Sequence, residues 1–252
     1  MNRKNIIHIL IILSSLIFLF VNSCSSRYKT SKKNLVLVIT GGHAFDTAQF
    51  FNMFFTFKDV SVDTISQPNA NILLETNKIK KYDVFVFYDM WQDITEKQKA
   101  GLLELLKEGK GMIFLHHSLV SYQEWGELIN IIGGRYHLES YMKDSSRLSG
   151  FEHDLDLQVK VLDKTHPVTD NMQDFRIHDE GYFNIEMIPS AYPLLEVNHP
   201  YCTKYVAWTN TYENSRIVYI LLGHDKYAYQ NEYFRLLVEN AVKWTSVRSS
   251  ED

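Results

Sequence analysis

The chain has 252 residues, of which 26 are basic and 30 acidic, so its formal net charge is −4 at pH 7. Residues 1–23 hold two of the basic residues and none of the acidic ones, so the remaining chain carries 24 minus 30, or −6. Basic residues outside that segment gather only into short pairs such as Lys32-Lys33 and Lys80-Lys81. Nucleic acid is therefore excluded as an expected partner, because binding it requires a basic surface.

The N-terminus predicts a targeting segment. Arg3 and Lys4 precede a nearly unbroken apolar run from Ile6 to Val21, and small polar residues then lead to Cys24. This order is typical of a secretory signal peptide, and the four residues ending at Cys24 resemble a bacterial lipobox. An uncleaved membrane anchor is the alternative, but the run is short for a span of about 20 residues.

We therefore expect a signal peptide over residues 1–23 and acylation of Cys24. Residues 24–33 are rich in Ser, Lys and Thr and are expected to form a tether, followed by one domain over residues 34–248. The protein would then lie in the cell envelope, facing the periplasm or the cell surface, and would touch the membrane only through its lipid. Cys202 would have no disulfide partner, so the domain must be stabilised by its core.

The first half of the domain alternates strands and helices. Residues 35–40 form an apolar run closed by Gly41-Gly42, as expected for a strand buried on both faces. A helix over 48–57 and a strand over 60–64 follow, and 84–88 is a second buried strand. This alternation predicts βαβ units and a parallel sheet.

A capping box marks the next helix, with Thr95 as the N-cap and Gln98 reaching back to it. The helix is expected to end near Gly109, before a further buried strand over 112–115. The pattern predicts a three-layer α/β fold, with a mostly parallel sheet and helices on both faces.

The second half is less regular. A helix is expected over 122–132 and a long loop over 135–150. The remaining expected elements are an alternating edge-type strand over 157–161, strands over 205–208 and 217–222, and an amphipathic helix over 233–244.

Polar residues follow several predicted strands. Ligands of open α/β sheets bind beyond the carboxyl ends of the strands, and the sequence places there His43, Asp89-Met90-Trp91, His116-His117-Ser118 and His224-Asp225. A further polar cluster, His178-Asp179-Glu180, lies in the second half. Together these residues predict a polar site along one rim of the sheet.

Six segments spread over residues 35–246 match one known family, and they are Ile39–His43, Gly111–His116, His166–Thr169, Phe175–Tyr182, Val206–Trp208 and Arg216–Asp225. Through these segments the chain resembles the ThuA-like family, which is named for trehalose utilisation and is related in fold to class I glutamine amidotransferases. The resemblance implies an α/β fold of the flavodoxin-like or class I glutamine amidotransferase-like type. Two departures concern the site: Glu213-Asn214-Ser215 stands where the family often has Gly-Lys-Gly, and the loop 135–150 is not a close match.

Amidotransferase chemistry itself is not expected. Those enzymes carry a cysteine nucleophile on the sharp turn after a buried strand, assisted by a histidine. The corresponding turn here is His116-His117-Ser118, and Cys202 lies far from it in sequence. Ser118 is a poor replacement because no Gly-x-Ser-x-Gly pattern frames it.

The candidate catalytic residues are His116, His224, Asp179 and Glu180, because imidazole beside carboxylate is suited to general acid–base chemistry near neutral pH. The candidate substrate-binding residues are His43, Trp91, Tyr182 and Asp225.

Each candidate also has a structural interpretation. His43 could cap a helix or bond to the backbone, Asp179 and Glu180 could form an interior salt bridge, and Asp225 could be an N-cap. The aromatic residues could simply pack in the core. Metal and cofactor needs stay open: no short metal-binding motif is present and no cofactor is assigned, but some of His43, His116, His178 and His224 could bind a divalent metal.

No role in the site is expected for His137, His153 or His199, which fall in polar segments. His166 is expected to be structural in its turn, and His117 to be packed or exposed. The resemblance implies a role in carbohydrate utilisation, with acid–base chemistry (hydrolysis, elimination or isomerisation) on a disaccharide or keto-glycoside. The alternative is a non-catalytic sugar-binding lipoprotein that serves a partner enzyme or transporter.

Overall fold

The computed structural model describes residues 33–138 and 145–247. The expected signal peptide and the lipidation site at Cys24 lie outside these residues. Among the helices of the described residues, none combines the length and apolar character needed to cross a membrane.

A nine-stranded sheet has the order β2-β1-β3-β4-β11-β10-β9-β6-β7. Its first five strands pair in parallel and are called here the parallel half. They are β2 (Val60–Ser66), β1 (Asn34–Gly41), β3 (Val84–Asp89), β4 (Gly111–Leu115) and β11 (Ser215–Ile220).

Four antiparallel strands extend the sheet beyond β11 and are called here the antiparallel wing. They are β10 (Tyr205–Tyr212), β9 (Tyr192–Val197), β6 (Gly150–Val161) and β7 (Phe175–Phe183). A separate small sheet pairs β5 (Gly134–Arg135) with β8 (Glu186–Met187).

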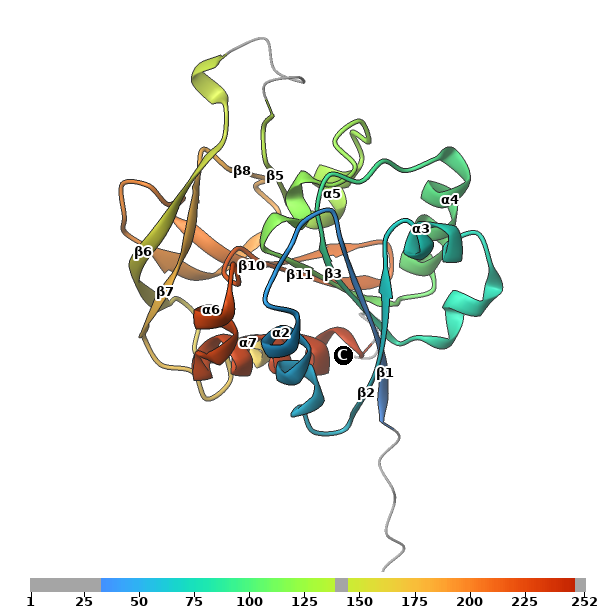
Figure 1. The fold of residues 1–252 in the computed structure, drawn as a ribbon, viewed down its shortest axis with the longest axis horizontal. Helices are drawn as coiled ribbons and strands as arrows, with labels where there is room; N and C mark the ends of the chain where they lie inside the picture. The colour runs from blue at the N-terminus through green and yellow to red at the C-terminus, as the bar shows by residue number, and fades with distance from the viewer. Residues whose placement is uncertain (1–32, 139–144, 248–252) are drawn as a thin grey trace, which may run out of the picture. The chain divides into compact units, whose positions relative to one another are not determined.

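Helices cover both faces of the parallel half, as expected from the sequence. Figure 1 shows α2 (Thr47–Phe55), α6 (Lys226–Gln230) and α7 (Glu232–Thr245) below the sheet, and α3 (Asn69–Leu73), α4 (Glu96–Lys107) and α5 (Leu128–Ile132) above it. The 3-10 helices are η1 (Asn77–Lys81), η2 (His116–Val120), η4 (Ser145–Arg147) and η5 (Pro167–Thr169). The predicted three-layer α/β architecture is thus confirmed.

The core explains why the first-half predictions are correct. All residues of β3 and β4 are buried, and Phe87 of one stacks on Phe114 of the other with ring centroids 4.7 Å apart. Burying each such side chain contributes about 1.5–3 kcal/mol. The capping box of Thr95 and Gln98 is formed with both of its hydrogen bonds.

Three predictions in the second half are wrong. The helix expected over 122–132 begins only at Leu128, because Tyr122 has φ 56° and breaks the helical backbone. The strand expected at an edge over 157–161 is part of β6, which lies between β9 and β7. The polar loop expected over 135–150 includes the end of β5, all of η4 and the first residue of β6, while residues 139–144 lie outside the described part.

Candidate active site

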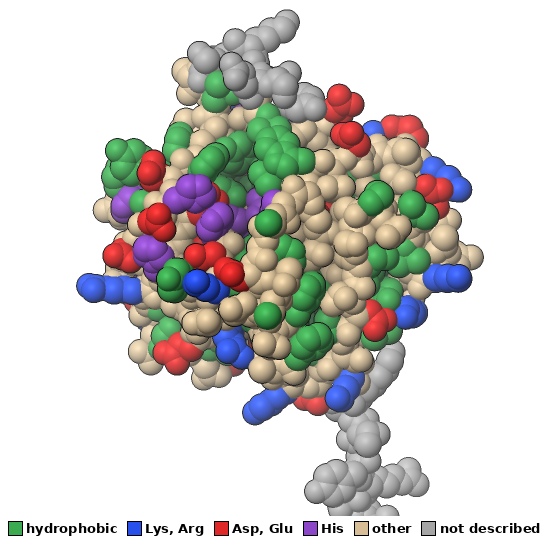
Figure 2. All heavy atoms as spheres, viewed as in Figure 1, with side chains coloured by type: hydrophobic (Ala, Val, Ile, Leu, Met, Phe, Trp, Pro, Cys, Tyr) green, Lys and Arg blue, Asp and Glu red, His purple; other side chains and the backbone are tan. Residues whose placement is uncertain are grey.

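A cavity of about 390 Å³ lies beyond the carboxyl ends of the parallel strands. Figure 2 shows histidine side chains gathered beside a hollow with hydrophobic walls. The cavity is lined by His43, Ala44, Met90, Trp91, His116, His117, Val120, Tyr136, Leu138, Phe151, His153, Glu180, Tyr182 and His224.

The parallel half supplies side chains that follow its strands. His43 follows β1, Trp91 follows β3, His116 and His117 begin η2 after β4, and His224 follows β11. This is the arrangement predicted from the sequence, since the carboxyl ends of parallel strands meet at one edge.

The antiparallel wing supplies the opposite side of the cavity from within its strands. Glu180 and Tyr182 belong to β7, and Phe151 and His153 belong to β6. The pairing of β6 with β7 shifts register between Glu152 and Leu155, which is the irregularity of a β-bulge. A bulge re-aims the neighbouring side chains, and here His153 contacts Glu180.

Backbone strain is concentrated at this edge. His116 and Trp91 have φ values of 50° and 58°, in the left-handed region that is unfavourable for side chains with a Cβ. Gly42 has φ 88°, and a Cβ there would lie 1.8 Å from the carbonyl oxygen of Met90, so only glycine allows the loops after β1 and β3 to approach. Such strain is typical of functional sites.

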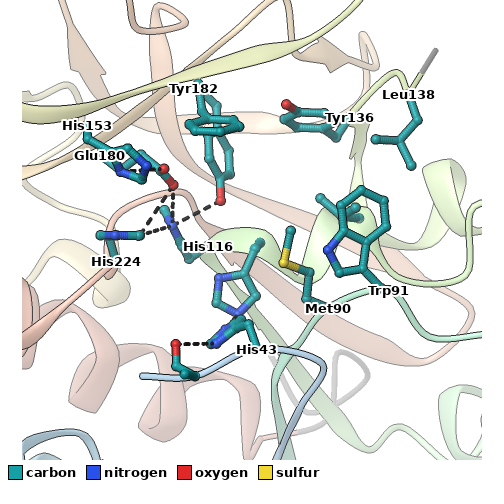
Figure 3. A pocket seen from close by; sticks show the side chains of 14 residues that line it. His43, Met90, Trp91, His116, Tyr136, Leu138, His153, Glu180, Tyr182 and His224 are labelled. Carbon is teal, nitrogen blue, oxygen red and sulfur yellow. Dashed lines mark hydrogen bonds and ion pairs between the residues drawn. The ribbon is translucent and has the colours of Figure 1, made fainter. Parts of the chain in front are cut away.

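Five side chains form what is called here the polar floor of the cavity: Glu180 at its centre, with His116, His153, His224 and Tyr182 around it. Glu180 Oε2 lies 2.8 Å from His116 Nε2 and 3.4 Å from His224 Nδ1, and its Oε1 lies 3.0 Å from His153 Nδ1. The hydroxyl of Tyr182 lies 3.0 Å from His116 Nε2. Figure 3 shows these side chains converging from the two halves of the sheet.

The charges of this floor are coupled. Burial raises the pKa of Glu180, but hydrogen bonds from His116 and His224 outweigh it and hold that pKa well below its usual range. The same hydrogen bond to Glu180 raises the pKa of His224, against the opposing effect of burial. The floor therefore contains a carboxylate that stays ionised at neutral pH.

His43 and His117 form a second pair beside this floor. Their Nε2 atoms are in hydrogen-bond contact, and His43 Nδ1 donates to the carbonyl oxygen of Ala44. Burial lowers the pKa of His43 and lowers that of His117 well below its usual value. Both imidazoles are therefore uncharged at neutral pH. His117, expected to be packed or exposed, is buried and also lines the cavity.

Asp179 lies behind the cavity wall and is not part of its lining. Its buried carboxylate accepts hydrogen bonds from the backbone N–H groups of Gly223, His224 and Glu180 at 2.8–2.9 Å. Burial raises the pKa of Asp179, and His116 and the backbone donors oppose that shift. Asp179 thus ties the loop after β11 to β7 and fixes the positions of His224 and Glu180.

The structure therefore corrects the expected positions of two residues. Asp179, expected beside the substrate, is a positioning residue, because its hydrogen-bond partners among the described residues are backbone N–H groups. Asp225, expected to contact substrate, is the N-cap of α6 and accepts from the N–H of Tyr227 at 2.8 Å. The other six candidates lie at the cavity and are His43, Trp91, His116, Glu180, Tyr182 and His224.

His178 lies apart from the cavity. It pairs with Asp156 at 2.9 Å and Asp154 at 3.5 Å on the exposed side of the wing. His166 caps η5 by accepting from the N–H of Val168, in agreement with the structural role expected for it.

His153 is the main cavity residue that the sequence did not reveal. It was expected in a polar segment, whereas it belongs to β6 and faces Glu180. The role of His153 could not be recognised because β7, the strand that pairs with β6, was not predicted. The sequence of β7 contains Asp, Glu and Gly, which are depleted in strands.

The cavity also has an apolar side. Figure 3 shows Trp91, Tyr136, Leu138 and Met90 grouped away from the Glu180 floor. Trp91 is 56% exposed, so its ring is available to a ligand. Cys202 is not among the lining residues, and burial raises its pKa to about 12, which keeps it a thiol at neutral pH.

Fold and site together define an α/β protein with a histidine- and carboxylate-lined ligand pocket at the carboxyl edge of its parallel strands. Residues 35–245 match the family described as ThuA, trehalose utilisation, and the chain belongs to that family. No curated protein matches the chain.

Solved structures with this fold include two ThuA-like proteins. One, from Parabacteroides merdae ATCC 43184, has a TM-score of 0.70 at 18% identity, covering 86% of this chain and 91% of its own. The other, from Bacteroides uniformis ATCC 8492, has a TM-score of 0.67 at 18% identity, with coverages of 88% and 94%.

A β-galactosidase from Bacillus circulans sp. alkalophilus also shares the fold. Its TM-score is 0.57 at 12% identity, covering 86% of this chain but 31% of the β-galactosidase. At these identities the likeness concerns the fold alone, an α/β sheet flanked by helices.

Proposed function

We propose that this protein is an enzyme of carbohydrate utilisation that acts on a disaccharide or keto-glycoside by moving a proton at the bound sugar. Hydrolysis, elimination and isomerisation all require such a step. Membership of the trehalose-utilisation family supports the sugar as the class of substrate.

The observation that carries the proposal is the position of Glu180. Its carboxylate lies between His116 and His224 at the floor of the cavity, within 2.8 and 3.4 Å of their nitrogens. An ionised carboxylate held against two imidazoles is costly to bury, and such groups cluster at sites that perform chemistry.

The apolar side of the cavity supports a sugar as the ligand. Aromatic faces such as those of Trp91 and Tyr136 offer a flat apolar surface for the C–H groups of a pyranose, while the polar floor can bond its hydroxyl groups. A cavity of about 390 Å³ falls in the range of small-molecule sites.

An NMR time course tests the proposal. The protein is incubated with trehalose, other glucosides and their 3-keto derivatives, and the same panel is run with Glu180→Gln and Glu152→Gln. Glu152 is exposed on β6 near His153, so its substitution removes the same charge from a neighbouring position outside the lining.

We expect conversion of at least one sugar by the wild type and Glu152→Gln, and at least about a 100-fold loss in Glu180→Gln. Saturation transfer from a sugar without conversion would contradict the enzyme and favour a binding lipoprotein. Equal conversion by Glu180→Gln and the wild type would contradict the assignment of the site.

We also propose that Cys24 carries a lipid and tethers the domain to the cell envelope. The apolar run and the lipobox-like residues before Cys24 support this location. Labelling expressing cells with a palmitate analogue should mark the wild type and not Cys24→Ser. A labelled Cys24→Ser protein, or an unlabelled wild type, would contradict the proposal.

A further inference from the structure

Three side-chain atoms that could ligate a metal form a compact triangle at the cavity floor. His116 Nε2 lies 3.2 Å from His224 Nδ1. Glu180 Oε2 lies 2.8 Å from His116 Nε2 and 3.4 Å from His224 Nδ1. A point about 2.1 Å from all three atoms exists, roughly 1 Å off their plane. That distance is the length of zinc–nitrogen and zinc–oxygen bonds in proteins.

The ring of His116 turns its Nε2 toward the other two atoms. His116 Nδ1 donates to the carbonyl oxygen of Leu221 at 2.6 Å, so a neutral ring has only a lone pair at Nε2. That lone pair faces the carboxylate of Glu180, His224 Nδ1 and the hydroxyl of Tyr182 together. A second proton on the ring could serve one of these neighbours, whereas a cation would attract all of them.

We propose that His116 Nε2, His224 Nδ1 and Glu180 Oε2 bind a divalent transition-metal ion. Two imidazoles and one carboxylate suit Zn²⁺, Co²⁺ or Mn²⁺ better than Mg²⁺, which prefers a shell of oxygen atoms. This inference deepens the proposed function and rests on it for the role of the ion, because the same floor faces the sugar.

The surroundings of the three ligands are those of a metal site. In such sites the second ring nitrogen of a ligating histidine usually donates to a carbonyl or carboxylate, as His116 does to Leu221. The free oxygen of Glu180 bonds to His153, and Asp179 fixes the backbone at both Glu180 and His224.

Three protein ligands leave coordination positions for solvent or substrate, the arrangement typical of catalytic rather than structural sites. All three ligating residues line the cavity of about 390 Å³. When bound there, the ion would polarise a sugar oxygen or lower the pKa of a bound water. The aromatic side of the cavity would hold the remainder of the ring.

The test is a titration of the full-length protein, stripped of metal, with Co²⁺, Zn²⁺, Mn²⁺ and Mg²⁺. It is repeated with His224→Ala, Glu180→Gln and the control His178→Ala, which removes a histidine paired with two exposed aspartates outside the cavity. Circular dichroism shows which variants are folded. The d–d absorption of bound Co²⁺ reports the ligand geometry in the wild type without any substitution.

We expect one equivalent of Co²⁺ or Zn²⁺ in the wild type and in His178→Ala, with a low-coordinate Co²⁺ spectrum and no tight Mg²⁺ binding. His224→Ala and Glu180→Gln should bind at least about 10- to 100-fold more weakly. Absence of stoichiometric binding in the wild type would overturn the inference, as would unchanged affinity in both folded site variants or loss of binding in His178→Ala.

The two proposals fail in different ways. Sugar conversion by metal-free protein that binds no ion would overturn the metal site and leave the enzyme standing. Stoichiometric metal binding without conversion of any sugar would support the metal site and count against the proposed function.

Discussion

The parallel half and the antiparallel wing contribute to one cavity in different ways. In the parallel half, His43, Trp91 and His116 each follow a buried strand and stand where the sheet ends. In the wing, His153 and Glu180 lie inside strands and reach the cavity from the side. The cavity thus lies where the two parts meet, and neither part contains a complete polar floor.

The two parts are joined by hydrogen bonds between β7 and the loop after β11. Asp179 of β7 accepts backbone hydrogen bonds from Gly223 and His224, which follow the last parallel strand. Gly223 has φ 116°, and a Cβ there would lie 2.7 Å from the ring of Phe234, so the loop that meets Asp179 depends on glycine.

The largest effect is expected from Asp179→Ala. Removing the carboxylate leaves three backbone N–H groups without their acceptor, two of them in buried residues, and should lower the free energy of unfolding by about 3–5 kcal/mol. Asp225→Ala is the control, because loss of its N-cap bond should cost only about 1 kcal/mol. Urea denaturation measures both, and equal losses would contradict the joining role of Asp179.

A smaller effect is expected from Asp89 in the parallel half. Burial raises the pKa of Asp89 to about 6 from the usual 3.8, and its Oδ1 has no hydrogen-bond partner among residues 33–138 and 145–247. The protonated Asp89 side chain therefore makes its full contribution to stability below pH 4, and this contribution is lost as the pH rises through 6. This rise in the pKa of Asp89 corresponds to about 3 kcal/mol of stability.

Asp89→Asn should consequently stabilise the protein relative to the wild type at pH 8, while the difference disappears near pH 4. Urea denaturation at both pH values measures it. If Asp89→Asn is less stable than the wild type at pH 8, the prediction is wrong, and the buried charge of Asp89 stabilises the fold.

The smallest effect is expected from Trp91→Ala. Loss of one aromatic face should weaken binding of the sugar identified in the NMR panel by about 1 kcal/mol, or roughly fivefold. Tyr227→Ala is the control, because Tyr227 is as exposed as Trp91, at 54% against 56%, and lies outside the cavity. Isothermal titration calorimetry distinguishes them, and an equal loss in both variants would argue against stacking on Trp91.

The same comparison explains what could be predicted from the sequence. Four strands of the parallel half (β1, β3, β4 and β11) contain continuous apolar runs, so their ends and the residues after them were recognisable, including His43, His116 and His224. Glu180 was recognised in the polar cluster His178-Asp179-Glu180. The strand that carries it, β7, was not predicted because it is rich in polar residues.

Pairing between distant segments was beyond the reach of sequence patterns. The register of β6 on β7, which brings His153 to Glu180, depends on contacts between residues far apart in the chain. The difference between Asp179 and Glu180, adjacent in sequence, arises from side-chain direction: one carboxylate turns to backbone N–H groups and the other to the cavity.

The most direct test of the proposed metal site is anomalous diffraction from crystals of the protein soaked in Zn²⁺, with data collected on both sides of the zinc absorption edge. We expect one strong peak about 2.0–2.2 Å from His116 Nε2, His224 Nδ1 and Glu180 Oε2, joining ligands from both parts of the sheet. Absence of a peak at these atoms, or a single peak at His178 instead, would contradict the account.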